Sequence, residues 1–289
     1  MELRTCPRFQ IGHNRPRGEV ALKAPSFAYA KAKSLAEAFD LAARPGARIL
    51  AGGQSLIASL NMRLAAPELV VDITGLRELA TISRSANGLR IGALVTHATL
   101  ERSREVAEHV PLLAQAAAEV AHPAIRNRGT LGGSLALADP AAEYPACALA
   151  LEASIVVAGP AGERRVPAAR FFRGLFETDI QTGELLVAAE FPRVARSVFL
   201  ELARRHGDYA IVGLAGVSTA SGRRFAFCGV GPTPVLATSA SRAATLETAL
   251  QALRQDLNPS ADLYHSAATK LHLAGVLLSR AWTTLAKPH

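Results

Sequence analysis

The sequence predicts an α+β fold in three parts: a small parallel unit, a larger mixed sheet and a C-terminal unit of sheet and helices. Residues 48–73 have the pattern of strand, glycine loop, helix and strand, which is typical of a βαβ unit with a parallel sheet. Strand-like segments then cluster between residues 153 and 230. An amphipathic helix at 261–286 closes the chain.

The composition is that of a globular protein. The chain has 289 residues, of which 49% are hydrophobic and 19% charged, so it can bury a full core and form two domains or one large one. Its cysteines are scattered and odd in number, at Cys6, Cys147 and Cys228. This excludes a disulfide framework and any Cys-x-x-Cys metal or iron–sulfur motif, and it indicates a reducing compartment, so we expect a cytoplasmic protein. No apolar run is long enough to span a membrane.

The first residues are basic and lack the apolar core of a secretion signal. Residues 1–21 carry several arginines, and we expect a disordered lead-in there, with a functional basic arm as the alternative.

A net charge of +8 raises the question of nucleic-acid binding. The arginines are spread along the whole chain, and aromatic residues make up only 5%, whereas base-stacking platforms need aromatics interleaved with cations. Nucleic-acid binding is therefore disfavoured. A basic surface would equally suit a phosphate-bearing cofactor or an acidic partner subunit.

The parallel unit begins with a predicted helix at 34–43, in which Ser34 is the N-cap and Glu37 occupies the capping-box position. The segments that complete it are a strand at 48–51, a helix at 56–64 and a strand at 69–73. The middle of the chain then offers a strand at 89–92, a long helix at 97–121, a loop at 122–140 and a helix at 141–152. Further strands are expected at 153–158, 184–191, 197–204 and 223–230, with a boundary at Pro192 and Arg193.

A glycine loop joins the first predicted strand to the helix that follows it. This first glycine loop consists of Ala51, Gly52, Gly53, Gln54 and Ser55. Paired glycines allow close backbone approach, and their N–H groups can form an anion cradle suited to a diphosphate, to which Ser55 can add a hydroxyl. The alternative is a tight strand-to-helix turn that binds nothing.

A second glycine loop repeats this logic about eighty residues later. It consists of Thr130, Leu131, Gly132, Gly133 and Ser134, with the hydroxyls of Thr130 and Ser134 flanking the glycine pair. The two loops together could enclose one diphosphate from two sides. Neither matches G-x-G-x-x-G or the P-loop, so a Rossmann NAD site and a P-loop kinase or GTPase are disfavoured.

Two further groups lie where a nucleotide site would need them. Asp139 follows the second glycine loop and is either a ribose ligand or the N-cap of a helix with Pro140 at its first position. Tyr209, at the end of a predicted strand, either lies against a flat ring system or is an ordinary half-buried tyrosine. The histidines show no metal-ligand spacing and there is no G-x-S-x-G elbow, so we expect neither a metal site nor catalytic side chains.

At this point the sequence resembles a known family, the FAD-binding medium subunits of molybdenum hydroxylases of the carbon monoxide, xanthine, nicotine and caffeine dehydrogenase type. The resemblance rests on the segments AGGQSLIASLNMRLAAPELVVDITGL (51–76), IGALVTHATLERS (91–103), AHPAIRNRGTLGGSLALADPAAEYPA (121–146), FFRGLFETDI (171–180) and ELARRHGDYAIVGLAGV (201–217). They occur in the family's order across residues 22–286.

The resemblance implies a two-subdomain FAD-binding domain of the vanillyl-alcohol-oxidase (PCMH) type, followed by a C-terminal domain of a small antiparallel sheet and helices. The implied bounds are 22–192 for the FAD-binding domain, divided into 22–75 and 76–192, and 193–289 for the C-terminal domain.

It also implies that both glycine loops hold the FAD diphosphate, that Leu186 contacts the flavin ring and that Tyr209 lies beside it. Glu143 stands where the family usually has an aspartate that contacts the nucleotide. Position 201, a lysine contact in some relatives, is Glu201 here.

The resemblance further implies a division of labour. Partner subunits, a large one with molybdopterin and a small one with two [2Fe–2S] clusters, would deliver electrons to the FAD of this chain, which would pass them to an external acceptor. The expected assembly is a dimer of heterotrimers. No acid or base is needed in this chain for such a relay. The alternatives are a stand-alone FAD oxidoreductase and a non-catalytic assembly or nucleic-acid-binding module.

Overall fold

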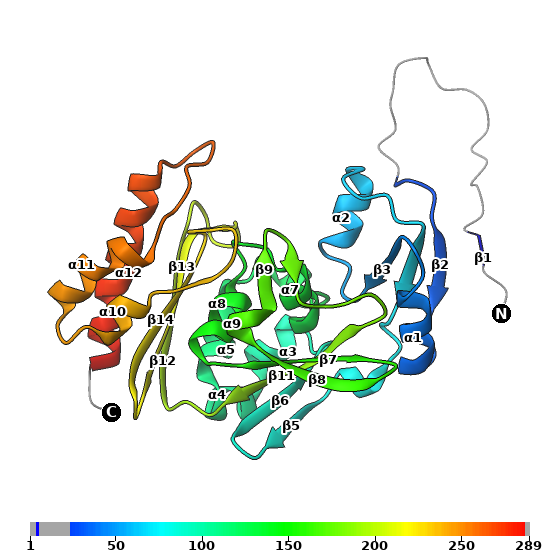
Figure 1. Cartoon of the computed structure of the whole chain (residues 1–289), viewed down its shortest axis with the longest axis horizontal. Helices are drawn as coiled ribbons and strands as arrows, with labels where there is room; N and C mark the ends of the chain where they lie inside the picture. Colours follow the sequence, from blue (N-terminus) through cyan, green and yellow to red (C-terminus); the bar gives the residue numbers. More distant parts are fainter. Residues whose placement is uncertain (1–3, 6–23, 287–289) are drawn as a thin grey trace.

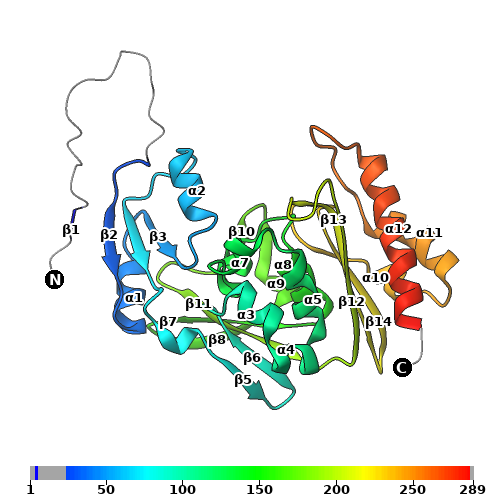
Figure 2. The same ribbon diagram turned by 180° about the vertical axis from the view of Figure 1, so that it is seen from behind.

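Three units follow one another along the longest axis of the molecule (Figure 1). The computed structural model describes residues 4–5 and 24–286. The N-terminal unit lies at one end, the central unit in the middle and the C-terminal unit at the other end, and Figure 2 shows the same order from behind. This is the predicted α+β architecture of three successive parts.

The N-terminal unit contains the predicted βαβ arrangement. Its strands are β1 (Arg4–Thr5), β2 (Ala28–Lys31), β3 (Ala47–Leu50) and β4 (Leu69–Asp72), in the order β1-β2-β4-β3. Both β2 and β3 pair with β4 in parallel, and the helices between them are α1 (Leu35–Ala42) and α2 (Leu56–Asn61). As predicted, the Ser34 hydroxyl accepts the N–H of Glu37, 3.2 Å away. The expected disorder of the lead-in concerns residues outside the described part, apart from β1.

The sheet of the central unit is antiparallel throughout, which corrects the prediction of a mixed sheet. Its order is β5-β6-β11-β7-β8, and each neighbouring pair runs antiparallel. The strands are β5 (Ile82–Ser85), β6 (Gly88–Gly92), β7 (Ser154–Gly159), β8 (Gly162–Pro167) and β11 (Leu185–Pro192). The connections β5–β6 and β7–β8 are tight turns, and a tight turn can join only antiparallel neighbours.

The long helix predicted at 97–121 is three helices, and the loop predicted at 122–140 is partly helical. The helices of this stretch are α3 (His97–Arg102), α4 (Arg104–His109), α5 (Pro111–Glu119), α6 (Pro123–Arg126) and α7 (Leu131–Leu137). Ser103 starts α4 by accepting the N–H of Val106, and Pro111, which has no N–H, starts α5. The Thr130 hydroxyl caps α7 by accepting the N–H of Gly133. These serine, threonine and proline signals are visible in the sequence and outweigh the continuous apolar stripe.

The central unit has a short helix ahead of β5 and further elements between α7 and β11. They are the short helix η1 (Arg77–Leu79), α8 (Glu143–Ala150), α9 (Ala168–Phe171), β9 (Phe172–Gly174) and β10 (Glu177–Thr178). Strands β9 and β10 pair in antiparallel fashion and form a small hairpin.

The C-terminal unit is an antiparallel sheet covered by helices. Its strands are β12 (Arg196–Ala203), β13 (Ala210–Thr219), β14 (Gly222–Cys228) and β15 (Val235–Leu236), in sequence order. Its helices are α10 (Thr238–Arg242), α11 (Leu246–Asp256) and α12 (Ala267–Ala286). The last helix begins six residues later than predicted, at Ala267, because Asp262 accepts the N–H groups of Tyr264 and His265 in a turn.

Both faces of the C-terminal sheet are buried. On β14, Ala226 and Cys228 belong to the core shared with α5 and α8 of the central unit, whereas Phe225 and Phe227 belong to the core shared with α11 and α12. This alternation is the two-residue period of a strand. The sheet thus joins the central unit to the C-terminal helices (Figure 1).

Candidate functional site

One cavity brings together the residues that the sequence singled out. It has a volume of about 770 Å³, within the range of small-molecule and cofactor sites. Both glycine loops line it, together with Glu143, Leu186 and Tyr209. Leu131 is the one predicted site residue that does not line the cavity, because its side chain is fully buried in the central core. The walls come from all three units.

The two glycine loops touch each other. A Cβ on Gly52 would lie 2.1 Å from the backbone oxygen of Arg128, just ahead of the second glycine loop. A Cβ on Gly133 would lie 4.0 Å from the Cβ of Ala51. Segments eighty residues apart in the sequence therefore meet at one wall of the cavity, and the close approach at Gly52 requires a residue without a side chain.

The first glycine loop carries a row of unpaired backbone donors. No N–H group from Gly52 to Leu56 donates a hydrogen bond to the described part of the chain. The side chain of Ser55, at the start of α2, makes no capping hydrogen bond either. Gly53 has a φ of +76°, which turns the backbone in the way that only glycine adopts freely. These residues are at least partly exposed and line the cavity, so their N–H groups are accessible and suited to an anionic ligand.

The second glycine loop differs from the prediction, because the N–H groups of Leu131 to Ser134 are already used. Leu131 and Gly132 donate to the backbone oxygens of Val95 and Ala93, both at 2.9 Å. The N–H of Gly133 bonds to the hydroxyl of Thr130 and that of Ser134 to the backbone oxygen of the same residue. This loop therefore offers hydroxyls and close approach to a ligand, while the first loop offers the backbone donors.

Asp139 is not a helix N-cap. The following helix, α8, begins at Glu143 with Ala142 as its N-cap, so Pro140 is not its first residue. One carboxylate oxygen of Asp139 instead accepts the N–H of Ala141 at 2.9 Å, which forms a local turn. Asp139 lines the cavity, and the ribose interpretation stays a prediction.

Two carboxyl groups interact near the cavity: Glu143 lines it, whereas Glu201 is half-buried and does not line it. Glu143 is 8% exposed, and its burial raises its pKa to about 7, with a further contribution from Asp139. Burial, followed by the negative charge of Glu143, raises the pKa of Glu201 to about 8, and one of its carboxyl oxygens is buried without a partner. The raised pKa values favour the protonated forms of both groups, and the protonated form of Glu143 is able to donate a hydrogen bond as well as accept one.

A buried histidine lies behind the second glycine loop and was not predicted as part of the site. His97 lines the cavity and is 5% exposed, and its ring centroid lies 5.2 Å from that of Tyr144, with the ring planes tilted by 32°. Burial, aided by the charge of Arg126, lowers its pKa to about 4, so the ring is neutral at pH 7. Its ring also packs against Gly129, since a Cβ there would lie 2.6 Å from it. A single histidine without a partner in the sequence gave no signal of this position.

The predicted ring contacts come from different units. Leu186 lies on β11 and is 6% exposed, so it presents a small apolar surface in the cavity wall. Tyr209 comes from the turn between β12 and β13 and is 74% exposed, which corrects the interpretation as an ordinary half-buried tyrosine. Phe176 and Ile180, from the segment after β9, also line the cavity. The cavity thus joins a polar, donor-rich part to a part with apolar and aromatic side chains.

Comparison with protein families divides the chain into two modules. Residues 25–194 match the FAD binding domain in molybdopterin dehydrogenase, and residues 197–285 match the CO dehydrogenase flavoprotein C-terminal domain. The chain belongs to this family of FAD-binding flavoprotein subunits. The family resemblance predicted from the two glycine loops is thereby confirmed.

Relatives of the flavoprotein subunit cover nearly its whole length. The 6-hydroxypseudooxynicotine dehydrogenase complex subunit alpha of Paenarthrobacter nicotinovorans is 39% identical, over 92% of this chain and 95% of its own. The carbon monoxide dehydrogenase medium chain of Hydrogenophaga pseudoflava is 35% identical, over 89% and 96% of the two chains.

Solved structures show the same fold. Carbon monoxide dehydrogenase from Hydrogenophaga pseudoflava superposes with a TM-score of 0.86 at 35% identity, over 91% of this chain and 98% of the other. Quinoline 2-oxidoreductase from Pseudomonas putida 86 gives a TM-score of 0.85 at 39% identity, with the same coverage. The predicted fold class of an FAD-binding domain followed by a C-terminal domain is confirmed.

Metal binding and membrane insertion are two other classes of function. In residues 4–5 and 24–286, no group of three or more His, Cys, Asp or Glu side chains is placed to hold a metal ion. The helices of that part are also too short or too polar to cross a membrane.

Proposed function

We propose that this flavoprotein subunit binds FAD and relays electrons within a heteromeric molybdenum hydroxylase. Electrons would arrive from the [2Fe–2S] clusters of a partner subunit and leave for an external acceptor. The observation that carries the proposal is the row of unpaired N–H groups from Gly52 to Leu56, which faces a cavity that the second glycine loop completes. Support also comes from relatives named as subunits or medium chains of dehydrogenase complexes.

The residues present fit an FAD molecule. The first glycine loop, Ala51 to Ser55, would hold the diphosphate with its backbone donors, because these N–H groups have no other partner in the described chain. Thr130 and Ser134 would add hydroxyls, and Gly132 and Gly133 would allow close approach. Leu131 would support the loop from the core, where its N–H fixes the backbone to Val95.

The remaining contacts would fix the rest of the nucleotide. Glu143, with a proton available near pH 7, would donate a hydrogen bond to a nucleotide oxygen or nitrogen. Leu186 and Tyr209 would hold the flavin ring, one from the sheet of the central unit and the other from the C-terminal unit. Glu143 places its carboxyl one methylene further from the backbone than an aspartate would.

Bound FAD supplies the redox chemistry, because it accepts and releases electrons singly or in pairs. The side chains of this chain bind and orient it and exclude water from it. We assign no catalytic acid or base here, since a relay of electrons requires none from this subunit.

The proposed assembly contains this chain, a large molybdopterin subunit and a small iron–sulfur subunit, arranged as a dimer of heterotrimers, in the cytoplasm and without nucleic acid. We further propose that the FAD-binding domain spans 22–192, divided at 75, and that the C-terminal domain spans 193–289. The family models meet between residues 194 and 197, which supports this boundary.

The test is to purify the complex from its native source or by co-expression and to measure flavin, iron and molybdenum per chain. We expect one FAD per copy of this chain, with iron and molybdenum in the partners. Flavin without partners or metals would favour a stand-alone oxidoreductase, and absence of flavin after incubation with FAD would contradict the proposal.

The variant Ser55→Ala tests the first glycine loop within that complex. It removes a hydroxyl that caps nothing, so the fold should be retained while the FAD dissociation constant rises about threefold to tenfold. Ser85→Ala, on β5 outside the cavity, is the matched control and should change nothing. Gly53→Val is less informative, because its φ of +76° would strain any valine even without FAD. Unchanged affinity in Ser55→Ala would remove this side chain from the proposed site.

A further inference from the structure

Phe176 is an exposed aromatic residue that lines the cavity and has a strained backbone conformation. Phe176 lies in the turn between β9 and β10, is 54% exposed and lines the cavity. Its φ is +56°, in the left-handed region that a bulky residue rarely adopts. A folded chain gains nothing from placing a large apolar ring in water at a conformational cost, and such strain clusters where a side chain must point in a functional direction.

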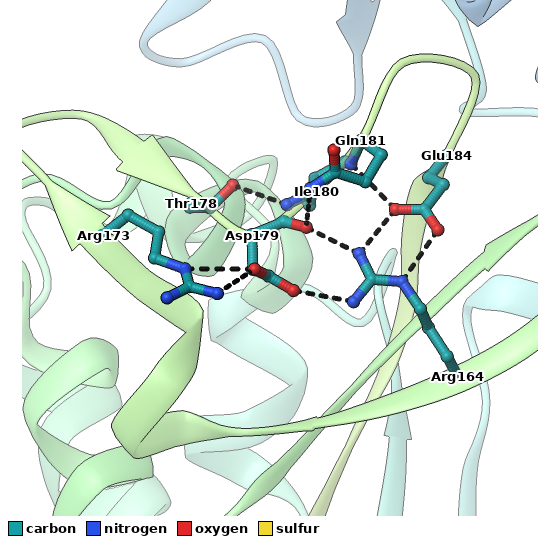
Figure 3. A network of polar contacts seen from close by, with 7 residues as sticks. All are labelled: Arg164, Arg173, Thr178, Asp179, Ile180, Gln181 and Glu184. Carbon is teal, nitrogen blue, oxygen red and sulfur yellow. Dashed lines mark hydrogen bonds and ion pairs between the residues drawn. The ribbon is translucent and has the colours of Figure 1, made fainter.

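The segment that carries Phe176 is held in place by a network of charged groups (Figure 3). The carboxylate of Asp179 accepts hydrogen bonds from Arg164, at 2.7 Å, and from the Nε of Arg173, at 3.0 Å. Arg164 lies on β8 and also bonds Glu184 at 2.6 Å, so the sheet of the central unit anchors both sides of the segment.

Backbone hydrogen bonds complete the anchoring. The N–H of Asp179 bonds to the oxygen of Phe171 at 2.9 Å, and the N–H of Gln181 bonds to the carboxylate of Glu184 at 2.8 Å, as Figure 3 shows for the latter pair. Hydrogen bonds from Arg173 and Arg164 lower the pKa of Asp179, so the network stays ionised across the neutral range. These interactions hold the strained turn in place, and they fix the position of Phe176 at the cavity.

The neighbouring residue provides an internal comparison. Leu175 belongs to the same turn and is 61% exposed, yet it does not line the cavity. Of the two apolar side chains in the turn, only the one with the strained backbone reaches the cavity. The cavity also receives Tyr209, the other exposed aromatic side chain that lines it in the described chain.

We propose that Phe176 is a positioning residue for the flavin, which packs its ring against the isoalloxazine and excludes water from it. This inference rests on the proposed function. Aromatic rings in contact favour offset or edge-to-face packing and exclude solvent, which explains why the fold accepts both the strain and the exposure. Phe176 and Tyr209 would then come from different units and act on the same ring system.

The experiment compares Phe176→Gly with Leu175→Ala in the purified complex. Phe176→Gly removes the ring and also relieves the backbone strain, so any loss in flavin binding is not a consequence of misfolding. We expect the FAD dissociation constant to rise about threefold to tenfold, the visible flavin absorption bands to move toward those of free FAD, and quenching of flavin fluorescence by iodide to increase. Leu175→Ala should leave all of these measurements unchanged. Phe176→Tyr keeps an aromatic ring and should give values close to those of the unmodified complex.

The outcomes separate this inference from the proposed function. If the unmodified complex binds no FAD, the proposed function fails. If it binds FAD, and Phe176→Gly leaves affinity, absorption and iodide access unchanged, Phe176 does not contact the flavin. Equal effects from Leu175→Ala would assign the change to the turn as a whole and would also overturn the inference.

Discussion

Glu143 and Glu201 give the chain a stability that depends on pH. Both have pKa values raised far above that of an ordinary glutamate, to about 7 and about 8, chiefly by burial. A raised acid pKa means that the folded state holds protons that the unfolded state has already lost. Stability is therefore greatest below the ordinary glutamate pKa and falls as pH rises through about 7 and 8.

We expect the melting temperature of the flavin-free chain to fall by several degrees between pH 5 and pH 8.5. Glu201→Gln should flatten this dependence, because it removes an ionisable group that does not line the cavity. Circular dichroism melts at a series of pH values provide the measurement. An identical pH profile in the variant would contradict the assignment of the slope to Glu201.

At the scale of single residues, the sequence predicted which residues line the cavity better than it predicted their protonation and hydrogen bonding. Glycine pairs and flanking hydroxyls predicted which loops line the cavity, because paired glycines allow close backbone approach and the same pattern occurs twice in the chain. The protonation of Glu143 and the neutral ring of His97 could not be predicted, since both depend on burial by segments distant in sequence. The use of the second loop's N–H groups by Ala93 and Val95 likewise arises only from tertiary contact.

At the scale of elements, Arg126 holds the end of α5 to α6. Its guanidinium donates to the backbone oxygens of Val120, at 3.2 Å, and Ala121, at 3.0 Å, and pairs with Glu101 at 2.9 Å. The residue is 8% exposed, so removing it would leave carbonyl groups and a carboxylate without donors. Arg126 thereby fixes the end of α6, which three residues separate from the second glycine loop.

We expect Arg126→Met to destabilise the chain by about 2–4 kcal/mol. Glu101→Gln keeps the bonds to the backbone oxygens and should cost about 1 kcal/mol or less, because that carboxylate is partly exposed to water. Urea unfolding of both variants provides the comparison. Equal destabilisation would show that the ion pair, and not the capping of α5, is what matters.

Elements were predicted well where local signals agreed and poorly where they competed. The cap at Ser34 and the parallel strands around the first glycine loop followed the prediction. The stripe at 97–121 suggested one helix, although Ser103 and Pro111 each start a new one. Strand β13 was missed because Gly213 and Gly216 weaken its local strand signal, and burial on both faces compensates for this.

At the scale of the whole molecule, the C-terminal sheet is a shared layer between two cores. Ala215 and Val217 of β13 pack toward the central unit, and Val212 and Leu214 pack toward the C-terminal helices. Separating the two family modules would expose the surface of α5 and α8 that β12, β13 and β14 cover. The two family modules are separate stretches of sequence, but they share a hydrophobic core.

We therefore expect residues 24–194 expressed alone to aggregate or to bind a dye for exposed apolar surface, whereas the full chain does not. Co-expression with residues 195–289 as a separate piece should restore a soluble complex. Gel filtration and dye fluorescence provide the measurements. A monomeric, cooperatively unfolding fragment of 24–194 would show that the sheet is dispensable for this fold.

The fold class and the family could be predicted at this scale because both glycine loops and the RRxGDY segment occur in order along one chain. The antiparallel character of the central sheet could not, since β6 and β11, which pair in its middle, lie about a hundred residues apart. Strand partners at that separation are set by tertiary packing and leave no local trace.

The cavity walls come from three units that follow one another along the chain and pack together through shared cores. A ligand that touches all of them adds contacts between the units beyond those of the shared cores. The flavin absorbance of a preparation would then report how many molecules are structurally intact, as well as how many can transfer electrons. Fractions with low flavin absorbance would contain chains in which the three units are held together less firmly. Adding FAD early in purification would preserve the fold along with the bound cofactor.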